Sequence, residues 1–349
     1  KSYEWNYANG PDFDGPYPAV PETPMKNFLG HPVRSRFGIP SSILPNSRWV
    51  EAYARLGFDV MTFKTVRSTS RLCGAAPNWA YLDESQIAAS LADPEVPIPI
   101  ANAVPATTIG RTMGGSFGMP SAAPRELWQA DFERARRALA PGQILIGSAV
   151  GTAGDGVTED AFVADFTNVA RWLAEAGAPI IEANFSCPNV GKAEGQLYMN
   201  LELATRVARS IKRAVDRPLM LKIGAIEDAE RLAATLSAFN GVADAVVLIN
   251  APARRIIDGK GAAYFGPGRE RAGVTGAAIK PISLRAVKNG IATIERLRLK
   301  LEVIAVGGIT TVEDVREFIA AGACAAQAAT ASMFNPFLAV DVKTQSPEI

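Results

Sequence analysis

The stretch Ile180-Ile181-Glu182-Ala183-Asn184-Phe185-Ser186-Cys187-Pro188-Asn189 decides the fold and marks the chemistry of this chain. It begins as an apolar run, typical of a buried strand, and ends in amides, a hydroxyl and a thiol. Pro188 has no N–H to donate to a strand ladder, and it biases Cys187 toward an extended conformation. In parallel α/β barrels, the loops after the carboxyl ends of the strands form the site. We therefore expect the Cys187 thiol at the mouth of such a barrel.

Length and composition predict a soluble protein that forms one large α/β barrel or two modest domains. The chain has 349 residues, of which 48% are hydrophobic, enough for a substantial core. Its 36 Lys and Arg balance 35 Asp and Glu, so we expect no nucleic-acid or acidic-membrane partner. No apolar run approaches the length of about 18 residues that a membrane span needs, and the N-terminus has no signal-peptide pattern. We expect a cytoplasmic protein.

Cysteine and histidine usage limits the chemistry further. Cys73, Cys187 and Cys324 lie far apart and form no Cys-x-x-Cys, so we expect no disulfide framework, zinc site or iron–sulfur centre within this chain. The only histidine is His31, ahead of the first predicted strand, and we interpret it as a structural or surface residue. Histidine-assisted nucleophilic catalysis and multi-histidine metal sites would both depend on that one residue. No metal site is therefore predicted.

Apolar runs alternate with amphipathic segments along the chain. Strands are predicted within 33–42 and at 59–64, 144–148, 180–186, 219–223, 245–250, 302–307 and 324–330. Helices are predicted from Asn46-Ser47 to Gly57 and at 158–176, 200–215, 226–239, 284–298 and 311–321. Short apolar strands with intervening helices favour an α/β fold of the (β/α)8 TIM-barrel type. No Gly-x-Gly-x-x-Gly follows an early strand, so a dinucleotide-binding sheet lacks its fingerprint.

Three segments depart from this alternation. Residues 1–27 are rich in proline, glycine and aromatic residues, and we predict an N-terminal extended strap beside a barrel of residues 28–349. The alternation is interrupted over residues 66–126, and we predict an elaborated loop there between strands two and three, with short extra strands near the barrel mouth. Residues 251–275 predict a further long loop.

Polar residues and glycines follow the predicted strands. Lys64 and Lys222 end two of them, and a buried ammonium is costly unless it meets an anion. Glycine-rich turns after the last strands offer backbone N–H groups where such barrels bind phosphate. We therefore predict a phosphorylated cofactor with an electron-rich ring. Each feature alone is also compatible with a structural role, as a tight turn, a surface charge or a packing thiol.

The stretch 184–189 resembles the signature of the dihydroorotate dehydrogenase family, which are FMN-dependent flavoproteins of pyrimidine metabolism. The resemblance covers about residues 28–337, and several motifs occur in the family's order. These motifs are Thr62-Phe63-Lys64-Thr65, Ser116-Phe117-Gly118-Met119-Pro120, Leu221-Lys222-Ile223, Asn250, Gly273-Val274-Thr275-Gly276, Gly307-Gly308-Ile309 and Ala329-Thr330.

The resemblance implies a role for each matched residue. The FMN-binding residues would be Ser41, Ser42, Lys64, Ser148, Asn184, Lys222, Asn250, Gly276, Gly307, Gly308, Ala329 and Thr330. The substrate-binding residues would be Lys64, Ser116, Gly118, Met119, Asn184, Asn189 and Asn250. Cys187 would be the base that takes a proton from substrate C5 while a hydride passes from C6 to flavin N5. A cysteine there resembles the soluble class 1 enzymes, and the resemblance further implies a homodimer and leaves room for an electron-transfer partner subunit.

Five residues at four sites depart from the family pattern. Gly115 and Ser121 stand where the substrate loop usually has asparagines, Ser41-Ser42 replaces part of an Ala-Ser-Gly turn, and Ala251 stands where serine is common. Each hydrogen bond lost from a buried ring-binding site costs about 1–3 kcal/mol. Dihydroorotate is the first expected substrate. The alternatives are a dihydropyrimidine dehydrogenase-like FMN enzyme acting on another cyclic amide, or a non-catalytic FMN- or phosphate-binding barrel. Fumarate and NAD, the latter through a partner subunit, are both compatible as electron acceptors.

Overall fold

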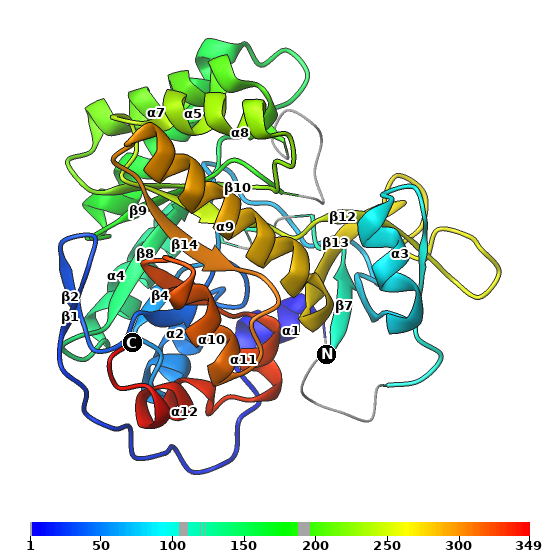
Figure 1. Ribbon diagram of the computed structural model, residues 1–349, viewed down its shortest axis with the longest axis horizontal. Helices are drawn as coiled ribbons and strands as arrows, with labels where there is room; N and C mark the ends of the chain where they lie inside the picture. The colour runs from blue at the N-terminus through cyan, green and yellow to red at the C-terminus, as the bar shows by residue number, and fades with distance from the viewer. Residues whose placement is uncertain (1, 105–110, 119, 122, 188–195) are drawn as a thin grey trace.

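A computed structural model of the chain describes residues 2–104, 111–118, 120–121, 123–187 and 196–349. Its centre is a closed barrel of parallel strands in the order β10-β11-β14-β15-β3-β4-β8-β9 (Figure 1). These strands are β3 (Phe37–Ile39), β4 (Val60–Thr62), β8 (Ile144–Ala149), β9 (Ile181–Asn184), β10 (Leu219–Ile223), β11 (Ala245–Leu248), β14 (Glu302–Val306) and β15 (Ala325–Gln327). The predicted (β/α)8 barrel is confirmed.

Helices follow the barrel strands and cover the outside of the barrel (Figure 1). They are α2 (Ser47–Arg55), α4 (Arg125–Arg137), α5 (Glu159–Glu175), α7 (Leu201–Ala214), α8 (Ala229–Phe239), α9 (Lys280–Leu297), α10 (Val312–Ala320), α11 (Thr330–Phe334) and α12 (Leu338–Gln345). The Asn46 side chain caps α2 as predicted, accepting from the Trp49 N–H. Helix α4 was not predicted, although Trp128, Phe132 and Ala135 form its buried face.

Side chains alternate between two apolar layers along the barrel strands. In β10, Leu219, Leu221 and Ile223 belong to the layer between barrel and helices, whereas Met220 belongs to the barrel interior. Lys222 continues the inward series and reaches the cavity described below. This period of two is what places functional side chains at the carboxyl end of each strand.

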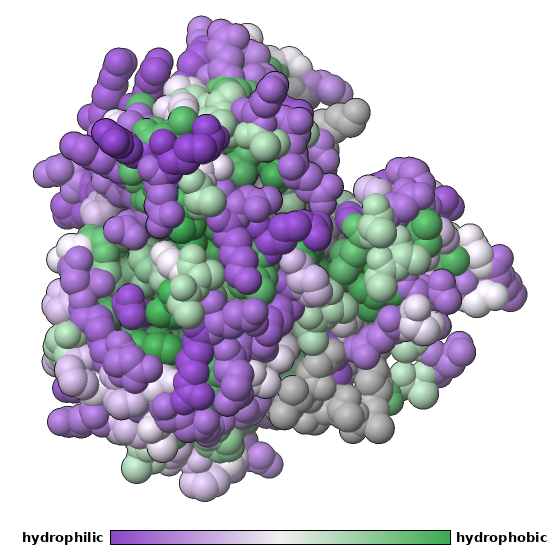
Figure 2. Space-filling model, in the orientation of Figure 1, coloured by the Kyte–Doolittle hydropathy of each residue, from purple (hydrophilic) through white to green (hydrophobic). Residues whose placement is uncertain are grey.

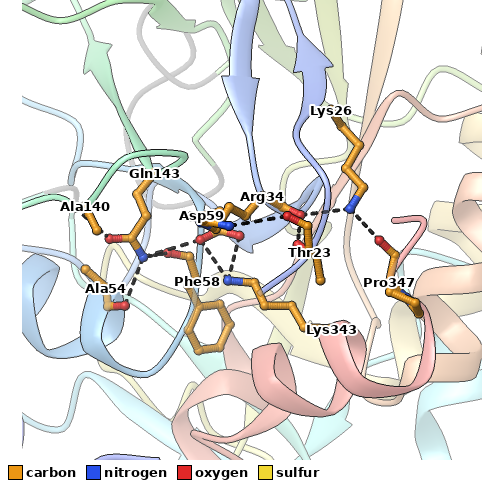
Figure 3. Close-up of polar contacts among 10 residues, drawn as sticks. All are labelled: Thr23, Lys26, Arg34, Ala54, Phe58, Asp59, Ala140, Gln143, Lys343 and Pro347. Carbon is orange, nitrogen blue, oxygen red and sulfur yellow. Dashed lines mark hydrogen bonds and ion pairs between the residues drawn. The ribbon is translucent and has the colours of Figure 1, made fainter. Parts of the chain in front are cut away.

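A hairpin closes the amino-terminal end of the barrel. Strands β1 (Lys26–Phe28) and β2 (His31–Val33) are antiparallel, and Phe28 and Val33 pack into the barrel interior with Val60. His31 lies on this hairpin, away from the carboxyl ends of the strands. Below the hairpin, Asp59 and Lys343 form a buried ion pair, with neighbouring polar contacts (Figure 3).

A lobe beside the barrel holds a second, five-stranded sheet in the order β5-β7-β13-β12-β6. Its strands are β5 (Trp79–Tyr81), β6 (Ile98–Pro99), β7 (Thr112–Gly115), β12 (Ala253–Ile257) and β13 (Arg271–Gly276), with the 3-10 turn Glu84–Gln86 and α3 (Ile87–Ala92). The lobe projects from the barrel (Figures 1 and 2). The extra strands predicted within 66–126 are confirmed. Residues 251–275, predicted as a loop, instead contribute β12 and β13, because both find partners in the first long loop.

The N-terminal strap needs one correction, because Tyr3–Asn9 form a helix, α1. The Ser2 side chain caps it by accepting from the Trp5 N–H. Two side chains hold α1 against the barrel: Asn46 Nδ2 donates to the Tyr7 carbonyl at 2.6 Å, and Trp49 Nε1 donates to the Asn6 carbonyl at 2.9 Å. Residues 10–25 then run without helix or strand to β1, as predicted.

Among the described residues, no helix is both long enough and apolar enough to span a membrane.

Candidate active site

A cavity of about 510 Å³ opens at the carboxyl ends of the barrel strands. Its walls come from the barrel loops, from the lobe and from α1. The structure brings together the predicted residues Ser41, Ser42, Lys64, Asn184, Cys187, Lys222, Asn250, Gly276, Gly307, Gly308, Ala329 and Thr330, all of which line it. Positions almost 300 residues apart in sequence therefore face one volume.

Two lysines place positive charge in this cavity. Lys222, at the end of β10, is 3% exposed, and neither its ammonium nor that of Lys64 forms an ion pair or hydrogen bond with another described residue. Burial lowers the pKa of Lys64, and the nearby Lys222 cation lowers it further, whereas Cys187 opposes this shift. Two cations that face one cavity favour an anionic or electron-rich ligand.

Asn184 and Asn250 form a fixed pair of amides on the cavity wall. Asn184 Oδ1 accepts from the Ser186 N–H at 3.2 Å and from Asn250 Nδ2 at 3.4 Å. Asn250 Nδ2 also donates to the Ser186 carbonyl, and its Oδ1 accepts from the Ala251 N–H at 2.8 Å. Backbone partners therefore set the orientation of both amides before any ligand binds.

Cys187 is positioned by the strand that precedes it. The Phe185 ring is fully buried on the outer face, 5.6 Å from the Phe166 ring and 6.2 Å from the Phe239 ring, measured between centroids. This anchor fixes the chain two residues before the thiol, which is 8% exposed and lines the cavity. Asn189 lies outside the described residues.

Two glycines line the cavity at positions where neighbouring backbone leaves no room for a side chain. Gly276 has φ +102°, and a Cβ there would lie 1.9 Å from the Arg111 carbonyl oxygen. Gly308 has φ +74°, and a Cβ there would lie 2.2 Å from the Lys280 nitrogen. Only glycine fits either position. Both glycines line the cavity, and backbone N–H groups in such turns can bind a phosphate group.

Three predicted residues are described but do not line the cavity. Ser148 lies beneath it, fully buried, and its hydroxyl is bonded to Glu182 and Thr65 instead. Ser116 and Gly118 follow β7 and do not line the cavity. Ser121, at one of the sites that depart from the family pattern, does not line it either, and its backbone pairs with Arg71. Met119 lies outside the described residues.

Several lining residues were missed from the sequence. Thr65 follows Lys64 directly, and its place after a strand could have indicated it. Asn78 and Trp79 come from the lobe, and Tyr3 and Asn6 come from α1. No sequence pattern indicated these four, because they reach the cavity only through long-range packing.

Comparison with known proteins identifies the family. The family model described as dihydroorotate dehydrogenase matches residues 125–349. The dihydroorotate dehydrogenase of Dictyostelium discoideum is 32% identical over 356 residues, which cover 97% of this chain and 94% of that protein. A crystal structure of DHODH in complex with ferulenol from Eimeria tenella matches with a TM-score of 0.73 at 17% identity, covering 97% of this chain and 87% of that one, and supports the fold.

Two further relatives match over about half of this chain. The catalytic subunit of dihydroorotate dehydrogenase B (NAD(+)) from Lachnoclostridium phytofermentans is 32% identical, over 52% of this chain and 58% of that protein. A putative dihydroorotate dehydrogenase A (fumarate) from Solibacter usitatus is 35% identical, over 49% of this chain and 55% of that protein. The fold and cavity are those of a (β/α)8-barrel oxidoreductase. The chain belongs to the dihydroorotate dehydrogenase family.

Proposed function

We propose that this protein is an FMN-dependent dehydrogenase that oxidises dihydroorotate to orotate in pyrimidine biosynthesis. The observation that carries the proposal is that Cys187, Lys222 and the Asn184–Asn250 amide pair share one cavity at the barrel mouth. Family membership and the names of the relatives support the same reaction.

The residues present fit a phosphorylated flavin. Lys222 and Lys64 would hold the electron-rich ring, since their ammonium groups are otherwise without a counter-ion among the described residues. Gly276, Gly308 and Thr330 would hold the phosphate, because all three line the cavity and the two glycines bring backbone to it without a side chain. FMN, when bound, would supply the two-electron acceptor for the hydride that leaves substrate C6.

In this proposal Cys187 removes the other hydrogen. Its thiolate takes the proton from C5, and the electron pair of that C–H bond forms the C5=C6 double bond as the hydride leaves C6. Atoms and electrons balance, because the substrate loses one proton and one hydride. Low exposure of Cys187 keeps water away from the reacting carbons.

The amide pair is suited to a cyclic ureide. Such a ring presents alternating N–H and C=O groups, and a carboxamide offers both a donor and an acceptor. Because backbone partners already orient Asn184 and Asn250, little side-chain entropy is lost when the ring binds.

The test is anaerobic mixing of the purified protein with dihydroorotate, dihydrouracil and dihydrothymine in turn. We expect a yellow protein whose flavin absorbance bleaches fastest with dihydroorotate. A protein that stays colourless after incubation with FMN contradicts the cofactor, and a yellow protein that no ring bleaches contradicts the dehydrogenase activity.

One observation favours a second candidate, the oxidation of another cyclic amide. Gly115 lines the cavity and brings no side chain to it, where the family usually has an asparagine. Faster bleaching by dihydrouracil or dihydrothymine than by dihydroorotate would support this candidate.

We further propose a homodimer and an electron-transfer partner. The support for a partner is that several relatives are named as catalytic subunits of dihydroorotate dehydrogenase B (NAD(+)). Another relative is named a putative dihydroorotate dehydrogenase A (fumarate), with no mention of a subunit. Light scattering would test the dimer. Reoxidation of the reduced protein by fumarate alone would argue against the need for a partner subunit.

A further inference from the structure

A hydrogen-bond network of four buried side chains runs from the cavity into the barrel interior. Ser41 Oγ lies 2.7 Å from Thr65 Oγ1, which lies 3.0 Å from Ser148 Oγ, which donates to Glu182 Oε1 at 2.8 Å. Ser41 lines the cavity, whereas Ser148 and Glu182 are fully buried. Among the described residues, Ser148 is the only hydrogen-bond partner of the Glu182 carboxyl.

Glu182 sets the direction of donation in this hydrogen-bond network. Each hydroxyl has a single hydrogen, and that of Ser148 goes to Glu182 Oε1. Ser148 must then accept the hydrogen of Thr65, which leaves Thr65 only lone pairs for its other neighbours. It accepts one hydrogen from Asn184 Nδ2, at 3.1 Å, and the other from Ser41. Every hydroxyl hydrogen in this network therefore points along it toward Glu182.

The direction decides what Ser41 presents to a ligand. One lone pair of Ser41 Oγ accepts the Thr65 backbone N–H at 2.9 Å, and its own hydrogen is turned inward to Thr65 Oγ1. Only a lone pair remains for the cavity. Without the Glu182 acceptor, Thr65 could donate to Ser41 instead, and the Ser41 hydrogen would be released toward the ligand.

We propose that Glu182 is a positioning residue that, through Ser148 and Thr65, makes Ser41 an acceptor for an N–H or O–H donor of the bound cofactor. The inference rests on the proposed function, because FMN is the ligand it concerns. Glu182 does not line the cavity, so we assign its effect on the ligand to the route through Ser148, Thr65 and Ser41.

The test is a double-variant cycle read out as FMN affinity, from the quenching of FMN fluorescence by apoprotein. Ser148→Ala removes a single oxygen and so interrupts the hydrogen-bond network between Thr65 and Glu182. We expect it to weaken FMN binding about five- to tenfold, the effect of one misdirected hydrogen bond. In a Ser41→Ala background the same change should alter affinity less than about twofold, because no hydroxyl is left to redirect.

Two variants at Glu182 and one control complete the test. Glu182→Gln keeps an oxygen that accepts from Ser148, so it should hold affinity within about twofold, whereas Glu182→Leu should match Ser148→Ala. Met220 pairs with Glu182 in the neighbouring strand, so Met220→Leu changes the same interior layer but removes no member of the hydrogen-bond network. It should leave FMN affinity unchanged.

The outcomes separate the two proposals. A parent protein that takes up no FMN overturns the proposed function and this inference with it. A parent that binds FMN, in which Ser148→Ala has no effect or has the same effect with and without Ser41, overturns this inference alone.

Discussion

Lys343 Nζ on α12 lies 2.8 Å from Asp59 Oδ2, just ahead of β4, and both side chains are only 1% exposed. The same nitrogen donates to Asp59 Oδ1 at 3.0 Å, and Gln143 Nε2 lies 3.4 Å from that oxygen (Figure 3). An ion pair shielded from water thus ties the last helix to the amino-terminal end of the barrel, opposite the cavity. Burial raises the pKa of Asp59 to about 6, although Lys343 and Gln143 oppose the shift.

This pKa shift sets the sign of a pH dependence. The pKa of Asp59 is higher in the folded chain than its unfolded value of about 4, so the folded state binds the proton more tightly. The contribution of this group to stability is therefore complete below pH of about 4 and is lost as the pH rises through about 6.

Lys343→Met should destabilise the protein most at alkaline pH. Above the folded pKa the variant buries an unpaired carboxylate, for which the expected loss in free energy of unfolding is about 3–5 kcal/mol. At pH 5 Asp59 is mostly protonated, so the loss should shrink. Urea unfolding at pH 5 and 8 measures the difference, with exposed Lys288→Met as the control. Equal losses at both pH values would contradict the role given to Asp59.

Gly115→Asn should shift substrate preference toward dihydroorotate or tighten its binding, because it adds an amide to the cavity wall. A Cβ at Gly115 would lie 2.7 Å from Phe117 Cε2, so this ring must turn aside. Gly115→Ala imposes the same steric change without the amide and is the matched control. Binding constants for the three dihydropyrimidines measure the effect. If the Asn and Ala variants behave alike, the amide does not reach the substrate.

The strand ends and the extra strands within 66–126 were predictable, but the part of the lobe that β12 and β13 form was not. Lys222 and Asn250 follow uninterrupted apolar runs, so their place at the barrel mouth follows from strand length and direction alone. Strands β12 and β13 escaped prediction because their partners, β6 and β7, lie over 150 residues earlier and the segment is rich in glycine and charge. Helix α1 buries no residue fully, so no apolar stripe marked it, although its Ser2 cap could have.

Hydrogen-bond partners were the least predictable part of the site. The sequence places Ser148 at the end of a strand, but not the fact that Glu182 and Thr65 occupy its hydroxyl beneath the cavity. Alternation along β9 predicts that Glu182 and Asn184 lie on the same face of the strand. That Asn184 lines the cavity, whereas Glu182 lies further inside the barrel, follows only from the pairing of β9 with its neighbours.

Lys222→Ala should weaken FMN binding, because it removes a buried cation that has no counter-ion among the described residues. Loss of one charge-assisted contact predicts a decrease in affinity of about tenfold or more. Fluorescence titration of apoprotein with FMN measures it. The exposed Lys288→Ala removes the same charge from the outside of the barrel and should bind FMN as the parent does; an equal effect of both variants would indicate a general rather than a local effect.

Trp49→Phe should loosen α1 without opening the barrel. The change removes the Nε1–H that donates to the Asn6 carbonyl but keeps an aromatic ring, which lies 6.4 Å from the Tyr53 ring between centroids in the parent. We expect faster proteolytic cleavage within residues 3–9 and an unchanged melting temperature. Cleavage at the parental rate would show that the Asn46 contact with Tyr7 suffices to hold the helix.

Cys187→Ala should retain fold and cofactor but lose most of the reductive half-reaction, since the proposed base is gone. Only the thiolate accepts a proton, and a thiol in water has a pKa of about 8.5, so flavin reduction in the parent should accelerate as the pH rises toward that value. Cys187→Ser should react at an intermediate rate, because a hydroxyl takes the same place but is a far weaker acid. Stopped-flow reduction by dihydroorotate measures all three proteins, and dye reoxidation of chemically reduced flavin, expected near the parental rate in each, is the control. Reduction of the alanine variant at the parental rate would leave Cys187 as a packing residue and assign the proton transfer to another group in the cavity.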